Sequence, residues 1–138
     1  MRVLSAMDIS ASGLYAERAR MNVIANNLAN ANSTRTPEGG PFRRQLILLR
    51  GNEAANTDTL ENLGVEVMGV VDDPTPFPMV FNPGHPDANA DGYVAMPNVN
   101  VVEEMVDMIT AVRAYEANIT AIEANKSMVR RSLDIIRE

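Results

Sequence analysis

The sequence predicts a mainly α-helical protein in which long N- and C-terminal helices pair antiparallel as a coiled-coil-like hairpin, with a small β/loop lobe inserted between them. Three observations predict this class. The last third of the chain carries apolar residues at heptad spacing, the first 32 residues repeat that pattern more weakly, and the intervening segment is rich in Pro and Gly. We therefore divide one structural unit into residues 1–32, 33–98 and 99–138.

The first predicted helix occupies residues 1–32, which contain no Pro and a single Gly, Gly13. Its seven-residue repeat consists of Met7, Leu14, Met21 and Leu28. Ala11 and Ala25 fill the companion positions of the repeat, whereas Arg18 interrupts them. This pattern is typical of an amphipathic helix that packs against a partner helix.

Asparagine is concentrated towards the end of this helix. Asn22, Asn26 and Asn30 lie four residues apart, and Asn27 adjoins them. Asn is a poor helix former because its amide competes for backbone groups. One interpretation is a fraying helix end that enters a loop. The other, which we favour, is close helix packing in which the amides hydrogen-bond across the contact.

The middle segment, residues 33–98, predicts loops and short strands. Its turn signals are the Pro- and Gly-rich runs Thr36–Pro41 and Asp73–Pro78. The predicted strands are Phe42–Leu49, Val65–Val71 and Met79–Phe81. The polar run Gly51–Asn62 predicts an exposed loop. The resulting lobe is too small for a separate enzyme domain.

The second predicted helix occupies residues 99–138, which contain neither Gly nor Pro. The first-position heptad series is Met105, Val112, Ile119, Lys126 and Leu133. The fourth-position series is Met108, Tyr115, Ile122, Val129 and Ile136. At 1.5 Å per residue the heptads span roughly 50 Å. Burial of one apolar stripe does not offset the entropy lost in ordering so long a helix, so the helix needs partners within the chain or outside it.

Charge is distributed unevenly over the 138 residues, whose net charge is −6. Residues 1–50 are net basic, whereas residues 51–104 contain ten acidic residues and neither Lys nor Arg. A segment with only negative charge is not a nucleic-acid face, and we interpret it as a solvated acidic surface. There is no cysteine, which excludes disulfides and thiolate metal sites. We find neither a secretory signal peptide nor an apolar run that could span a membrane.

Few residues suggest chemistry. Asp87–Gly92 fits the first six positions of an EF-hand calcium loop, but the twelfth position is Asn98 where Glu is expected, so an Asx-rich turn is the better interpretation. His85 is the only histidine and lies in a turn. Glu103 and Glu104 stand at a predicted helix start, where carboxylates favour the helix dipole. We therefore predict no catalytic site, cofactor, metal or small-molecule substrate.

Several segments carry a resemblance to a known family. They are Ser12–Leu14, Met21–Asn32, Thr36–Gln45, Asn82–Asp87, Asp91–Asn100 and Val99–Ser127. Together they resemble the flagellar rod and hook axial proteins, and the proximal rod members more than the longer distal rod and hook members. In that family the terminal segments form paired helices that build the inner tube of a helical filament, and they tend to order only on assembly.

The resemblance implies a structural subunit of the bacterial flagellar basal-body rod, which transmits torque across the periplasm. Its implied partners are copies of itself, related rod proteins and the flagellar type III export apparatus, which would export it without a cleavable signal peptide. The candidate assembly residues are Leu14, Met21, Asn22, Asn26, Asn27, Leu28, Asn30, Tyr115, Ile119, Ile122, Val129 and Leu133. The alternative is a cytosolic helical-hairpin adaptor that binds one partner helix and forms a closed complex of fixed size.

Overall fold

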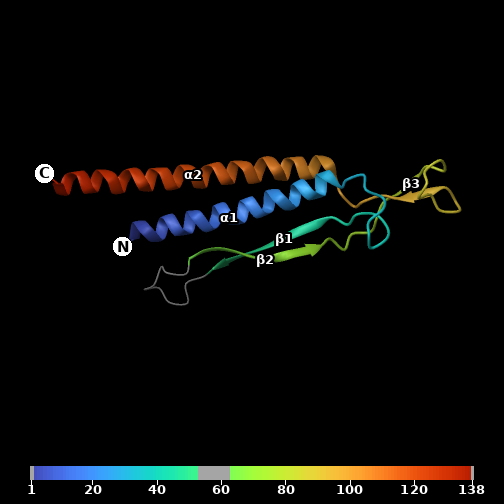
Figure 1. Ribbon diagram of the computed structural model, residues 1–138, viewed down its shortest axis with the longest axis horizontal. Coiled ribbons are helices and arrows are strands. Elements are labelled where there is room, and N and C mark those ends of the chain that lie inside the picture. The colour runs from blue at the N-terminus through green and yellow to red at the C-terminus, as the bar shows by residue number, and fades with distance from the viewer. Residues whose placement is uncertain (1, 53–62, 138) are drawn as a thin grey trace. The chain divides into compact units, whose positions relative to one another are not determined.

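The computed structural model describes residues 2–52 and 63–137 and is mainly helical, with two long helices and short strands that follow the first helix and precede the second in the chain (Figure 1). The helices are α1, Arg2–Ala29, and α2, Val101–Arg137. The strands are β1, Gln45–Asn52; β2, Gly64–Asp72; β3, Met79–Phe81; and β4, Tyr93–Ala95. Strand β1 pairs with β2, and β3 pairs with β4. No helix in these residues is long and apolar enough to span a membrane.

The predicted elements differ from the structure mainly at strand boundaries. The first strand begins at Gln45 and runs to Asn52, so the predicted loop at Gly51 and Asn52 is wrong; the rest of that loop, residues 53–62, lies outside the described residues. Strand β4 was not predicted, because three residues carry too little alternation to be recognised. Strand β3 occupies the predicted residues.

Local chemistry accounts for the start of α2 and the end of α1. The Asn100 Oδ1 atom accepts hydrogen bonds from the backbone N–H groups of Val102 (3.1 Å) and Glu103 (3.4 Å), as an N-cap residue does. Helix α1 ends at Ala29, and the Asn30 side chain turns back to donate to the Asn26 carbonyl at 2.9 Å. The Asn30 backbone N–H donates to the same carbonyl at 3.1 Å, so the side chain adds a second contact at the end of α1.

The chain divides into two compact units, and the first comprises Met1–Met21, Leu48–Gly69 and Thr110–Glu138. Small residues allow close helix contact in this unit: Ala16 and Ala111 are buried, and a Cβ atom at Gly13 would lie 2.9 Å from Asn118 Nδ2. The strand Gly64–Asp72 joins α1 here, since the Val65 N–H donates to Ser12 Oγ at 3.1 Å.

The second unit comprises Asn22–Ile47 and Val70–Ile109. Its β3 and β4 strands are antiparallel, with Val80 opposite Val94 and Phe81 opposite Tyr93. The Phe81 and Tyr93 rings meet edge to face at 5.2 Å between centroids, and Val94 is buried. Ile24 of α1 is also buried in this unit. The apolar core is small, so polar contacts carry much of its organisation.

Candidate functional site

A buried carboxylate, Glu104, is the centre of the second unit. Glu104 lies in the first turn of α2 and is 1% exposed. Its Oε1 accepts a hydrogen bond from Arg44 Nε at 2.6 Å, and its Oε2 accepts one from Asn27 Nδ2 at 3.0 Å. Because a buried carboxylate is costly unless it is paired and hydrogen-bonded, these partners are required. The predicted interaction of a carboxylate with the helix dipole fits the exposed Glu103. It does not account for Glu104, which is buried and hydrogen-bonded to other elements.

Asn27 joins α1 to this carboxylate and to β1. Its side chain is buried, its Nδ2 also donates to the Gln45 carbonyl at 2.9 Å, and its Oδ1 accepts from the Gln45 N–H at 2.9 Å. The adjacent Asn26 donates to Gln45 Oε1 at 2.9 Å. Both amides therefore bridge elements that are distant in sequence, and Asn27 pairs with a strand backbone as a neighbouring strand would.

Arg44 connects Glu104 to the segment after β2. Its Nη1 lies 3.3 Å from Asp73 Oδ2, and its backbone N–H donates to Asn98 Oδ1 at 2.7 Å. Burial alone would lower the pKa of the Arg44 guanidinium, but Glu104 and Asp73 raise it above its ordinary value. Hydrogen bonds from Thr75, and then Arg44, lower the pKa of the Asp73 carboxyl. We call the cluster of Asn27, Arg44, Asp73, Asn98 and Glu104 the polar junction. Both of its carboxylates are paired with the Arg44 guanidinium.

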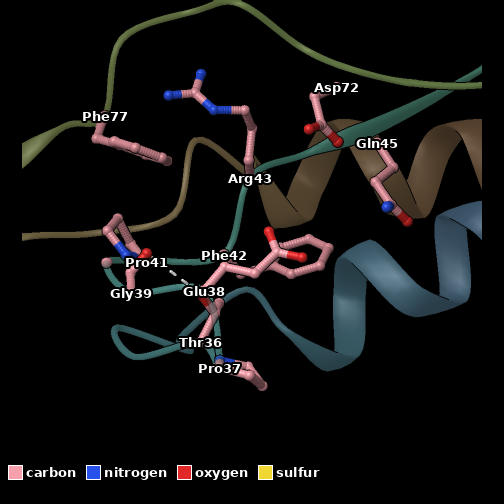
Figure 2. A pocket seen from close by; sticks show the side chains of 11 residues that line it. Thr36, Pro37, Glu38, Gly39, Pro41, Phe42, Arg43, Gln45, Asp72 and Phe77 are labelled. Carbon is pink, nitrogen blue, oxygen red and sulfur yellow. Dashed lines mark hydrogen bonds between the residues drawn. The ribbon is translucent and has the colours of Figure 1, made fainter.

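The second unit also contains a pocket of about 480 Å³, and Figure 2 shows the side chains that line it. It is lined by the turn Thr36–Phe42 together with Arg43, Gln45, Asp72 and Phe77. The Arg43 guanidinium lies over the Phe77 ring, 4.2 Å from its centroid, and Nη1 donates to the Asp73 and Thr75 carbonyls. These contacts already engage the Arg43 guanidinium within the chain. We therefore interpret the pocket wall as a part of the lobe that stabilises its structure.

The calcium-like loop is organised as a turn. The Asp87 carboxylate accepts hydrogen bonds from Thr34 and Arg35, which lower its pKa, Thr34 first. Asn89 Oδ1 accepts from the backbone N–H groups of Asp91 and Tyr93, the Asx-turn arrangement. Within the residues that the structure describes, no three His, Cys, Asp or Glu side chains are grouped to hold a metal ion.

Among the described acids of the middle segment, Glu66, Asp72, Asp91 and Glu103 are exposed as predicted, and several acids are also paired with arginines. Arg35 pairs with Asp87, Arg44 with Asp73 and Glu104, and Arg50 with Glu66. These arginines lie between residues 35 and 50, immediately before the segment that lacks Lys and Arg. The charge asymmetry of the sequence is therefore the signal that could have identified the polar junction, had it been interpreted as internal pairing.

The candidate assembly residues fall into three exposure classes. Asn27 is buried. The half-buried residues are Leu14, Met21, Leu28, Asn30, Tyr115, Ile122 and Val129. The exposed residues are Asn22, Asn26, Ile119 and Leu133. Burial in the isolated chain thus separates residues already covered from residues available to another molecule.

The two heptad series of α2 differ in the same way. In the fourth-position series Met108, Tyr115, Ile122 and Val129 are half-buried; the side chain of Ile136 is not described. In the first-position series Met105, Val112, Ile119, Lys126 and Leu133 are exposed. A helix of 37 residues therefore keeps a second, largely apolar stripe uncovered, which is typical of an interaction surface.

Comparison with known proteins gives matches at both ends of the chain and over its whole length. Residues 7–35 match the family described as flagella basal body rod protein, and residues 90–135 match the C-terminal family of flagellar basal body rod FlgEFG proteins. The flagellar basal-body rod protein FlgC of Borreliella burgdorferi is 44% identical, covering 99% of each chain. Those of Bacillus subtilis and Salmonella typhimurium are 38% and 42% identical, covering 98% of this chain and 99% and 98% of theirs.

Proposed function

We propose a mode of assembly from the fact that this chain belongs to the FlgC family of flagellar basal-body rod proteins. In this proposal, the two terminal helices are the elements through which the chain joins the rod. The chain is a structural subunit of the proximal rod and not an enzyme. The observation that carries this function is identity of 38–44% to named rod proteins over nearly the full length. It assembles with other rod proteins, which the adaptor alternative would not do.

The proposed polymerising element is an antiparallel, coiled-coil-like hairpin of α1 and α2. One contact within each compact unit supports it: Gly13 lies against Asn118 in the first, and Asn27 donates to Glu104 in the second. From Gly13 to Asn27 the chain advances along α1, whereas the contacted residue moves back along α2 from Asn118 to Glu104. This is the order of contacts that antiparallel helices produce. We accordingly treat residues 1–32 and 99–138 as axial segments and residues 33–98 as a lobe.

Assembly on this scheme uses the candidate residues in two ways. The half-buried Leu14, Met21, Tyr115 and Ile122 keep the helices paired, and exposed residues such as Ile119 and Leu133 meet neighbouring subunits. Contacts between different faces of identical subunits extend into a helical filament when the rotation does not close. A shaft of this kind transmits torque because every subunit is held on several sides.

Two further properties follow from rod membership as proposals. A rod subunit works in the periplasm, so this chain has to leave the cytoplasm. We propose that the flagellar type III export apparatus carries it there without a cleavable signal peptide. An export assay in a strain that lacks this apparatus tests the proposal: the chain should stay in the cytoplasm, and its appearance outside would contradict the route.

Aspartate substitutions test the role of the helices. Ile122→Asp places a charge on the half-buried side of α2, and Leu28→Asp does so on α1. In a strain that lacks the native gene, each variant should abolish motility and recovery of the chain with basal bodies at normal protein levels. Ala124→Asp, at an exposed site on α2, is the matched control and should remain motile. Normal motility of the Ile122→Asp and Leu28→Asp strains would contradict the proposal.

A further inference from the structure

Two exposed stripes lie on the helices of the first unit. The outer stripe of α1 consists of Asp8, Ala11, Tyr15 and Arg18. The outer stripe of α2 consists of Glu116, Ile119, Glu123 and Lys126. Both follow the alternating three- and four-residue spacing that keeps side chains on one face of a helix. Tyr15, with 68% of its surface exposed, is the most prominent apolar group of the α1 stripe, and Ile119 is the apolar residue of the α2 stripe.

We propose that the outer stripe of α1 in one copy of this chain packs antiparallel on the outer stripe of α2 in the next copy, with Tyr15 opposite Ile119. The proposal rests on the proposed rod function and deepens it by naming the two faces that meet between copies. Its occupant is a second copy because the two stripes complement each other in charge and in size.

Charge fixes both the direction and the register of this contact. With Tyr15 opposite Ile119 and the helices antiparallel, the three- and four-residue spacings match, so Arg18 faces Glu116 and Asp8 faces Lys126. A parallel arrangement with the same central pair sets Arg18 near Glu123 but leaves Asp8 opposite Val112. The antiparallel register therefore forms two ion pairs where the parallel one forms a single pair, and charge pairing of this kind selects the partner and the register.

A shift by one heptad weakens this complementarity. Moved one heptad towards the C-terminus of α2, Tyr15 would face Lys126 and Asp8 would face Leu133, and Arg18 opposite Glu123 would be the one ion pair left in the stripe. Moved one heptad the other way, Asp8 would face Ile119 and Arg18 would face Ile109. Both shifts set charges against apolar side chains, which costs desolvation without a partner.

The proposed contact has the layout of a stable protein interface. An aromatic–aliphatic pair, Tyr15 and Ile119, lies at its centre, where binding energy is usually concentrated, and charged pairs flank it. Ala11 leaves room for the methylene groups of Glu123. The outer stripe of α1 and the outer stripe of α2 are different surfaces. The contact between them is therefore heterologous, as a growing filament requires.

The absence of cysteine in the sequence allows a direct cross-linking test. Two copies are co-expressed in a strain that lacks the native gene, a tagged Tyr15→Cys chain and an untagged Ile119→Cys chain, and isolated basal bodies are oxidised. We expect a mixed disulfide dimer. The control pair Tyr15→Cys with Lys126→Cys should give at least about fivefold less, because one heptad displaces the thiol by roughly 10 Å, beyond disulfide reach.

The outcomes separate this contact from the rod function. Equal yields for the two pairs, disulfides to a different rod protein, or no disulfide in motile cells would overturn the contact and leave the rod function intact. Failure of the unsubstituted chain to appear in basal bodies would overturn the rod function itself.

Charge reversal gives a second measurement that does not require cysteines. Arg18→Glu and Glu116→Arg should each lower recovery of the chain in basal bodies by about tenfold, because like charges then face each other. The double variant should restore recovery. Failure of the double variant to restore it would contradict the pairing, whereas restoration would also show that the single variants were not misfolded.

Discussion

The two compact units of this chain are organised by different kinds of contact. The second unit has the polar junction, in which Glu104 and Asn27 are both 1% exposed and fully engaged by Arg44 and Gln45. The first unit relies on small residues such as Ala16 and Ala111, and its helices expose Tyr15 and Leu133. From this difference we expect the second unit to hold its structure within one chain more firmly than the first, whose helices should gain stability from neighbouring subunits.

The largest expected effect is at the polar junction. Glu104→Ala leaves Arg44 and Asn27 without their buried partner and should lower the free energy of unfolding by about 3–5 kcal/mol. Urea denaturation of the purified chain measures the change. Glu103→Ala, at the exposed neighbouring position, is the control and should stay within about 0.5 kcal/mol. Similar losses for both variants would contradict the role given to the buried Glu104 carboxylate.

Asn27→Ala should rank second. It leaves the Gln45 backbone N–H and the Glu104 carboxylate each short of one hydrogen bond, which should cost about 2 kcal/mol. Asn26→Ala, which loses exposed side-chain contacts to Gln45 and Asn30, should cost less than about 1 kcal/mol. Urea denaturation of the two variants side by side provides the comparison, and a larger loss for Asn26→Ala would contradict the role given to Asn27.

A third substitution tests the helix contact in the first unit. Gly13→Val introduces a Cβ atom 2.9 Å from Asn118 Nδ2 and should weaken helix pairing by about 1–3 kcal/mol through overpacking. We expect reduced motility in the complemented strain and partial restoration by the added change Asn118→Ala. Gly51→Val, where the space is open, serves as the control. Equal motility of the two glycine variants would argue against a close helix contact.

The smallest expected effect is on acid stability. Thr34 and Thr75 are the main causes of the lowered pKa values of Asp87 and Asp73, so each carboxyl binds a proton less readily in the folded state than in the unfolded state. Their stabilisation is fully present above the unfolded Asp pKa of about 3.9 and is lost as the pH falls through the lower folded-state pKa. In thermal unfolding between pH 7 and pH 2, Asp87→Asn should flatten this acid loss. An unchanged pH profile would contradict the assignment.

Local patterns in the sequence were sufficient to predict the two helices. The heptad series around Tyr115 and Leu14 depends only on residues close in sequence, and both helices were predicted within a few residues of α1 and α2. The contact of the Asn30 side chain with the Asn26 carbonyl at the end of α1 is also local. Strand β4 was missed because its order comes from pairing with β3, not from its own three residues.

The polar junction could not be predicted in the same way. Arg44 and Glu104 are 60 residues apart, and several other acids could have paired with Arg44 equally well on the basis of charge alone. The division of α2 into covered and uncovered stripes was also beyond the sequence, since Ile119 and Ile122 have the same side chain. Which one is covered depends on the tertiary contacts of the folded chain.

Hydrogen–deuterium exchange of the purified monomeric chain would test the contrast between the units most directly. We expect slow exchange at residues 22–29, 45–47 and 101–109, which belong to the unit with the polar junction. We expect fast exchange along residues 6–21 and 110–135, with protection there appearing only in assembled rods. Equal protection along the full length of both helices in a monomer would contradict the claim that the first unit depends on neighbouring subunits.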